Sequence, residues 1–336
     1  MPPEEIANAQ PRGALRLIMM GTGPFAVPTF ASLLKSSHRV FALVTRPDRP
    51  AHRREKTPAN PMREAAQKEN LEVFEPETIN SAQAQSWLRD RAADLFVVCD
   101  YGQILSKETL ALARLGGINL HASILPKYRG AAPINWAIYH GEKETGVTII
   151  HMTPKLDAGP AIVQQCTEIG PSETAPELEA RLAELGCSAV LEAIEMLARD
   201  KVAQGVVQNE TLATKAPRLK KADGLVDWSR SPVAIFNQVR ALQPWPKTYS
   251  FWKPPQSEPL RLILERVQPI NQFAEVSNEL GGHSPGVIAL AQGNDLVVYC
   301  GQGSLRIEAI QPAGKRVMSA DEFLRGHCVR AGDRLG

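Results

Sequence analysis

Residues 117–133 read GINLHASILPKYRGAAP, and this stretch decides the fold that we expect for the first half of the chain. Successive side chains of a strand point to opposite faces, so Asn119 and His121 share one face while Ile118 and Leu120 lie in a core behind them. A loop containing a proline then leaves the strand, and loops of this kind can bind ligands. For a histidine taken alone, the simpler interpretation is a strand that reaches the surface and ends in polar residues.

Apolar runs alternate with stretches of helical period up to residue 199. Strands that alternate with helices form parallel sheets, so this order predicts an α/β fold with a doubly wound, mostly parallel, Rossmann-like sheet. Ligands of such sheets bind beyond the carboxyl ends of the strands, where Asn119 and His121 lie. The predicted strands are 15–20, 40–45, 71–74, 95–99, 117–121 and 147–152, and the predicted helices are 27–36, 62–70, 81–91, 107–113, 133–139 and 173–199, the last interrupted near Gly186.

A glycine turn, GTGPFA at residues 21–26, follows the first predicted strand. It matches G-x-G-x-x-A, a weak sign of dinucleotide binding. An acidic residue should end the next strand if NAD were bound, whereas here Thr45 is followed by Arg46 and Pro47. We therefore favour plain strand-to-helix packing. A nicotinamide-dependent dehydrogenase, or a nucleotide-binding module without catalytic activity, remains the alternative from a different class.

The composition changes after Lys201. Residues 206–222 are polar and basic and read as a linker, and a helix is predicted at 232–242 before a Pro-Trp-Pro turn. Short strands separated by turn residues then predict a small, OB-like β-barrel. These strands are 248–252, 260–267, 286–291, 295–299 and 304–310. The chain thus divides into a disordered leader at 1–14, a first domain at 15–205, the linker at 206–222 and a barrel domain at 223–336.

The composition argues against several classes of protein. The 336 residues are enough for two domains, and the five scattered cysteines favour free thiols over a disulfide framework or a zinc site. No apolar run approaches the roughly 20 residues that span a bilayer, and we expect no signal peptide. Because the net charge is only +2, any contact with nucleic acid must be local. We expect a cytoplasmic monomer without a metal.

The polar residues of the predicted strand end suit acyl transfer. A neutral imidazole such as His121 can take a proton from an amine at neutral pH, and the amide of Asn119 can stabilise an oxyanion. Asp157, in the turn sequence LDAGP at 156–160, could orient the imidazole, although alone it reads as a turn residue. No G-x-S-x-G or H-E-x-x-H pattern occurs. The residues therefore indicate direct acyl transfer to an amine, or hydrolysis if water attacks.

Residues 46–61 form a basic stretch punctuated by prolines. It contains six basic residues and only two acidic ones, although the protein as a whole is nearly neutral. This local excess of positive charge suits contact with a phosphate backbone. A solvated surface loop explains the composition equally well. The basic residues are Arg46, Arg49, His52, Arg53, Arg54 and Lys56.

Four segments together resemble the folate-dependent formyltransferase family: NLH at 119–121, SILPKYRGAAP at 123–133, GVT at 146–148 and LDAG at 156–159. Members of that family transfer a formyl group from 10-formyltetrahydrofolate to an amine. The resemblance implies a catalytic trio of Asn119, His121 and Asp157. It also implies a folate-contacting loop made of Ser123, Ile124, Leu125 and Pro126.

The second half resembles the family members that act on methionyl-tRNA, through KADGLVDWS at 221–229, PWP at 244–246, QPAGK at 311–315 and MSA at 318–320. The resemblance implies that the acceptor is the α-amine of methionyl initiator tRNA, for translation initiation, and that the barrel domain binds tRNA. It assigns tRNA contacts to Arg46, Arg49, Arg53, Arg54, Lys56, Lys220 and Lys221.

Two relatives within the class remain as rivals. One formylates an amino-sugar nucleotide, and the other hydrolyses formyl-folate. Residues 311–315 and the basic stretch argue against the first of these. The chain also departs from the family pattern at Gly23-Pro24, Ser106, Ala122 and Pro160, none of which belongs to the trio.

Overall fold

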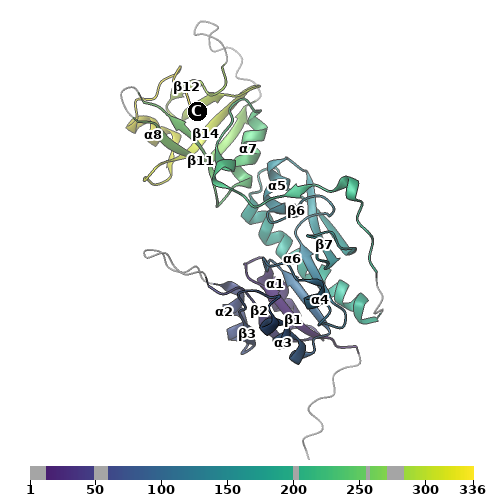
Figure 1. Ribbon diagram of the computed structural model, residues 1–336. Coiled ribbons are helices and arrows are strands. Elements are labelled where there is room, and N and C mark those ends of the chain that lie inside the picture. The colour runs from purple at the N-terminus through teal and green to yellow at the C-terminus, as the bar shows by residue number, and fades with distance from the viewer. Residues whose placement is uncertain (1–12, 49–59, 200–203, 255–257, 271–283) are drawn as a thin grey trace, which may run out of the picture. The chain divides into compact units, whose positions relative to one another are not determined.

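The computed structural model describes residues 13–48, 60–199, 204–254, 258–270 and 284–336 (Figure 1). The chain forms two compact units. The first contains Met1–Pro133, Glu144–Glu168 and Glu179–Pro217, and the second contains Ile134–Lys143, Ile169–Leu178 and Arg218–Gly336. None of the helices in the described ranges is long and apolar enough to cross a bilayer.

A seven-stranded sheet forms the centre of the first unit, in the order β3-β2-β1-β4-β5-β7-β8. The first five strands pair in parallel, and β7 and β8 are antiparallel additions at one edge, so the predicted mostly parallel sheet is confirmed. The strands are β1 (Arg16–Gly21), β2 (Arg39–Val44), β3 (Glu72–Phe74), β4 (Leu95–Cys99), β5 (Gly117–His121), β7 (Glu144–His151) and β8 (Ala161–Glu168).

Strand β4 is buried along its whole length, as expected of a central parallel strand covered on both faces. On one face Phe96 and Val98 belong to a core with Leu88 of helix α3 and Leu110 of helix α4. Asn119 pairs with Val98 in the parallel register, so it shares that face. The helices are α1 (Ala26–Leu34), α2 (Pro61–Lys68), α3 (Ala82–Arg91), α4 (Lys107–Leu110), α5 (Pro133–Tyr139) and α6 (Ala175–Arg199).

Helix starts follow the capping rules. Asn60, Ser81 and Ser106 each precede a helix and accept a hydrogen bond from the backbone N–H three residues ahead, which satisfies a donor that the helix leaves free. Ser106 departs from the family pattern, and here its hydroxyl caps α4.

The interruption that we predicted near Gly186 is wrong, because α6 runs unbroken from Ala175 to Arg199. Glycine inside a helix costs about 1 kcal/mol relative to alanine, a cost that tertiary packing can offset. A Cβ at Gly186 would lie 2.6 Å from Leu120 Cδ2, so the glycine lets α6 approach β5 closely. Leu120 stands between Asn119 and His121, and α6 therefore supports the strand from behind.

The glycine turn after β1 is explained by similar packing. A Cβ at Gly23 would lie 1.7 Å from Asp100 Oδ2, so a larger residue there would require the Asp100 side chain to move. In the same turn the backbone N–H of Thr22 donates to the carbonyl of Asp100 at 3.1 Å, so the turn joins the carboxyl ends of β1 and β4.

The second unit is built on an antiparallel sheet in the order β10-β11-β14-β13-β12, with β15 paired to β14. Residues near the C-terminus bridge its two edges, because Leu335 pairs with Trp252 of β10 and Arg334 pairs with Val287 beside β12. This bridging agrees with the predicted small barrel. The elements are α7 (Pro232–Ala241), β10 (Thr248–Trp252), β11 (Leu260–Ile270), β12 (Ile288–Gln292), β13 (Asp295–Tyr299), β14 (Ser304–Pro312), β15 (Met318–Ser319) and α8 (Ala320–Gly326).

The stretch expected to be a linker begins with residues that pair with the first unit. Val206 exchanges two backbone hydrogen bonds with Ala161, of 2.7 and 2.8 Å. Strand β9 (Lys215–Ala216) then pairs in parallel with β6 (Arg129–Gly130). The residues between these pairings, which include Gln208, are thereby held beside the loop that follows β5.

Candidate active site

Asn119, the middle residue of β5, presents an open amide. The residue is half-buried, and no hydrogen bond engages its side chain within the part of the chain that the structure describes. Buried polar groups in proteins are ordinarily hydrogen-bonded. The open amide of Asn119 is therefore available to a substrate oxygen.

His121 is held in one tautomer by a backbone carbonyl. Its ring is almost fully buried, with 6% of the residue exposed, and Nε2 lies 2.9 Å from the carbonyl oxygen of Tyr128. A carbonyl oxygen only accepts hydrogen bonds, so Nε2 must carry the proton. The lone pair of the neutral ring is then on Nδ1.

Asp157 faces that lone pair. Its Oδ2 lies 3.7 Å from Nδ1 of His121, which is an ion-pair distance but too long for a hydrogen bond, and its side chain is 10% exposed. The same oxygen accepts the backbone N–H of Gly130 at 2.9 Å, which fixes the carboxylate. If Nδ1 takes up a proton, the ring becomes a positively charged imidazolium, which the carboxylate of Asp157 attracts. The structure thus brings together His121 and Asp157, which are 36 positions apart in the chain.

The turn that carries Asp157 is held by a residue that our sequence analysis did not single out. Asp157 has a φ of +48°, a left-handed conformation that costs a non-glycine residue energy. Gln208 Nε2 donates to the carbonyls of Asp157 and Gly159, at 2.9 and 2.7 Å. No local sequence pattern could reveal this contact, because Gln208 lies 51 positions from Asp157.

The predicted folate loop is tied to the sheet by two polar side chains. Thr148 pairs with His121 in the β5–β7 register, and its hydroxyl donates to the carbonyl of Ser123 at 2.7 Å and accepts the N–H of Leu125 at 3.1 Å. Gln164 of β8 donates to the carbonyl of Leu125 at 2.7 Å. The loop therefore has a fixed shape beside the imidazole.

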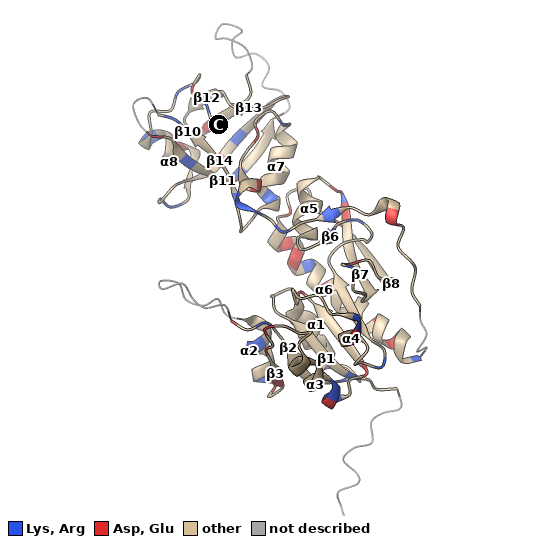
Figure 2. Cartoon of the chain, in the orientation of Figure 1, with Lys and Arg blue, Asp and Glu red and all other residues tan. Residues whose placement is uncertain are grey.

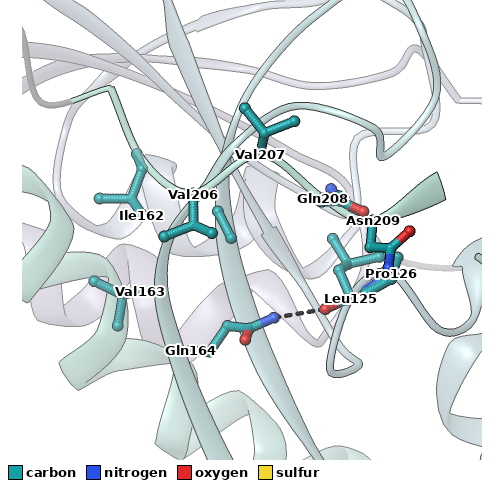
Figure 3. A pocket seen from close by; sticks show the side chains of 10 residues that line it. Leu125, Pro126, Ile162, Val163, Gln164, Val206, Val207, Gln208 and Asn209 are labelled. Carbon is teal, nitrogen blue, oxygen red and sulfur yellow. Dashed lines mark hydrogen bonds between the residues drawn. The ribbon is translucent and has the colours of Figure 1, made fainter. Parts of the chain in front are cut away.

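A pocket of about 380 Å³ lies beside this loop (Figure 3). Two of the four predicted folate residues, Leu125 and Pro126, form one wall, and β8 and residues 206–209 form the others. Its lining is mainly apolar, and Figure 3 shows the hydrogen bond from Gln164 to Leu125 across its lower part. Asn119 and His121 do not line it.

A charged cluster flanks the site. Arg129 donates to both carboxylate oxygens of Glu210, at 3.1 and 3.0 Å, and Lys155 donates to Oε2 at 2.9 Å. Arg129, followed by Lys155, lowers the pKa of the exposed Glu210 carboxyl to about 2. Glu210 therefore stays ionised at neutral pH, and the cluster keeps its charge there. No group of three His, Cys, Asp or Glu side chains that could hold a metal occurs among the described residues.

The residues predicted to contact tRNA are only partly described. Arg49, Arg53, Arg54 and Lys56 lie outside the described residues. Arg46 is half-buried in the first unit, and Lys220 and Lys221 are exposed in the second. Figure 2 marks in blue further Lys and Arg positions along the strands and loops of the second unit.

Comparison with known proteins covers both halves of the chain. Residues 15–194 match the family described as Formyl transferase, and residues 218–328 match the family described as Formyl transferase, C-terminal domain. The methionyl-tRNA formyltransferase of Rhodopirellula baltica is 40% identical over 345 residues, which cover 100% of this chain and 99% of the relative. That of Geobacter sulfurreducens is also 40% identical, covering 96% of this chain and 97% of the relative.

Solved structures share the fold at lower identity. The sugar 3N-formyl transferase WlaRD has a TM-score of 0.61 at 16% identity, covering 90% of this chain and 99% of its own. An N-formyltransferase from Helicobacter canadensis has the same TM-score at 17% identity, covering 87% of this chain and 98% of its own. The matches over both halves show that the chain belongs to the formyl transferase family.

Proposed function

We propose that this chain transfers the formyl group of 10-formyltetrahydrofolate to the α-amine of methionyl initiator tRNA, for translation initiation. The observation that carries the proposal is its 40% identity, over both domains, to relatives named methionyl-tRNA formyltransferase. The sugar formyltransferases are only 16% and 17% identical to this chain, so their similarity indicates a shared fold and not a shared substrate.

His121 is the proton acceptor in this proposal. As the amine nitrogen bonds to the formyl carbon it must lose a proton, and Nδ1 is the ring atom with a free lone pair. The resulting imidazolium is paired with Asp157 at 3.7 Å. When the bond from the formyl carbon to N10 of the folate breaks, His121 returns the proton to N10, so tetrahydrofolate leaves as a neutral amine. No covalent enzyme intermediate is needed.

Asn119 stabilises the charge that develops on the formyl oxygen. Its amide is open, half-buried and on the same strand as the base, two residues away. A preorganised donor of this kind is worth about 10²-fold to 10³-fold in rate. Because Asn119 and His121 share one face of β5, the formyl oxygen can contact Asn119 while the attacking amine contacts His121.

The loop of Ser123, Ile124, Leu125 and Pro126 contacts the folate in this proposal. It follows the catalytic strand directly, and the hydroxyl of Thr148 holds its shape. Folate rings need flat apolar surface together with a few backbone groups, which a fixed loop supplies. One solved structure of similar fold, HypX from Aquifex aeolicus, was determined with tetrahydrofolic acid.

We also propose that tRNA is bound by local positive charge, and that the protein acts as a monomer in the cytoplasm, where translation takes place. The contacts would come from Arg46, Arg49, Arg53, Arg54 and Lys56 in the formyltransferase domain (15–205), and from Lys220 and Lys221 in the linker (206–222), with the barrel domain (223–336) lying along the RNA. Lys220 and Lys221 are exposed, as phosphate contacts require.

The function is tested by a formylation assay. Purified protein with 10-formyltetrahydrofolate should convert methionyl initiator tRNA to formylmethionyl-tRNA and should act far more slowly on methionyl elongator tRNA. His121→Ala should lower kcat by at least ~10²-fold, because the amine then lacks its base. Failure to formylate either tRNA, with transfer to an amino-sugar nucleotide instead, would reject the proposed substrate.

The folate loop is tested through Thr148. Thr148→Val keeps the shape of the side chain but removes the hydroxyl that holds Ser123 and Leu125. We expect the KM for 10-formyltetrahydrofolate to rise by about 10-fold, the cost of leaving buried groups unpaired, with little change in the KM for tRNA. Thr145→Val, at another buried threonine of β7, is the control. Equal changes in the two KM values would contradict a folate role.

The basic loop is tested by salt dependence. Each phosphate contact contributes about 0.9 to the slope of log affinity against log salt. Replacing Arg53 and Arg54 by alanine should therefore lower that slope for initiator tRNA by about 1 to 2. A variant with Lys68 and Arg89, both exposed, replaced by alanine serves as the charge-matched control. If the slope is unchanged when Arg53 and Arg54 are replaced, the loop does not contact the tRNA phosphates and is a solvated surface loop.

A further inference from the structure

We propose that Gln208 is a positioning residue for formyl transfer, because its side chain sets where Asp157 stands relative to the imidazole of His121. This inference rests on the proposed function and adds to it a residue outside the trio. Gln208 is 8% exposed and touches no reacting group.

Both ends of the Gln208 amide are fully used. Nε2 donates to the carbonyls of Asp157 and Gly159, at 2.9 and 2.7 Å. Oε1 accepts from Nε and one terminal nitrogen of Arg129, at 3.1 and 2.8 Å. A guanidinium only donates and a carbonyl only accepts, so the amide has a single orientation. Neither glutamate nor leucine can reproduce this set of bonds.

These four bonds join the two segments that make the site. Arg129 precedes Gly130, whose N–H holds the Asp157 carboxylate at 2.9 Å. Gln208 holds the backbone of the same aspartate from the other side. The carboxylate and the main chain of Asp157 are therefore fixed by neighbouring parts of one network, and the distance from Asp157 Oδ2 to Nδ1 depends on it.

Two further observations explain why the network is rigid. Arg129 is also clamped by Glu210, which stays ionised at neutral pH and in turn binds Lys155, two positions before Asp157. The left-handed φ of Asp157 needs external support, since an unsupported turn would relax toward ordinary backbone angles. Gln208 supplies that support through the carbonyls of Asp157 and Gly159.

Gln208 also lines the pocket beside the folate loop, so the test must separate positioning from substrate binding. A positioning role predicts a loss in kcat, and a binding role predicts a rise in KM. Gln208→Leu should lower kcat by about 10-fold to 30-fold, a typical cost of misplacing a group that orients the base, while both KM values change by less than about 3-fold.

Gln238 provides a matched control. It is 1% exposed in the second unit, and its Nε2 donates to two backbone carbonyls, those of Asp223 and Leu225, at 2.8 and 3.0 Å. Gln238→Leu removes the same kind of buried bonds away from the trio. Its kcat per folded molecule should stay within about 2-fold of wild type. An equal loss of kcat in both variants would show that the effect is general destabilisation, and the proposal would be overturned.

A double-mutant cycle shows whether Gln208 acts through Asp157. In the Asp157→Ala background, Gln208→Leu should cause less than about 2-fold further loss, because the group that it positions is already absent. If the two losses multiply instead, Gln208 acts by another route and the inference is wrong.

A spectroscopic readout keeps this test separate from the proposed substrate. The imidazole NMR signals of His121 in the free protein should shift in Gln208→Leu in the same direction as in Asp157→Ala, and should stay in place in Gln238→Leu. Unmoved signals in Gln208→Leu would overturn the positioning role. An inactive wild type with the expected shifts would instead reject the proposed substrate and leave the role of Gln208 standing.

Discussion

The hydrogen bond between Nε2 of His121 and the carbonyl oxygen of Tyr128 is the constraint on which the site depends. It places the ring proton on Nε2, so the lone pair that can receive a proton is on Nδ1. Nδ1 faces Asp157, whose carboxylate gains a favourable partner only when the ring is protonated. The carbonyl of Tyr128 thus leaves the basic lone pair of the imidazole on Nδ1, and Asp157 stabilises the ring once Nδ1 is protonated.

The fold supplies this arrangement from distant parts of the chain. Strand β5 ends with the amide and the imidazole, and the close approach of α6 at Gly186 backs Leu120 between them. The loop that returns Tyr128 to the ring is anchored by Thr148 on the neighbouring strand. Gln208 brings the segment after α6 against the Asp157 turn. Rigid elements therefore hold these atoms where catalysis needs them, since a misplacement of about 1 Å can lower the rate about 10²-fold.

Much of this could be predicted from local pattern, and the rest could not, for identifiable reasons. Side-chain alternation places Asn119 and His121 on one face, and the alternation of strands and helices predicts the sheet, because both depend on neighbouring residues. The break near Gly186 was wrong because helix propensity is a weak preference that packing against Leu120 overrides. Gln208 could not be found, since its bonds depend on how loops far apart in sequence meet.

The central claim, that Nδ1 of His121 accepts the proton of the amine, is tested most directly by the ¹⁵N NMR signals of the ring in the free protein. At a pH where the imidazole is neutral, our account predicts a protonated Nε2 and an Nδ1 with the shift of an unprotonated nitrogen. A protonated Nδ1 bound to Asp157, with the lone pair on Nε2, would contradict it.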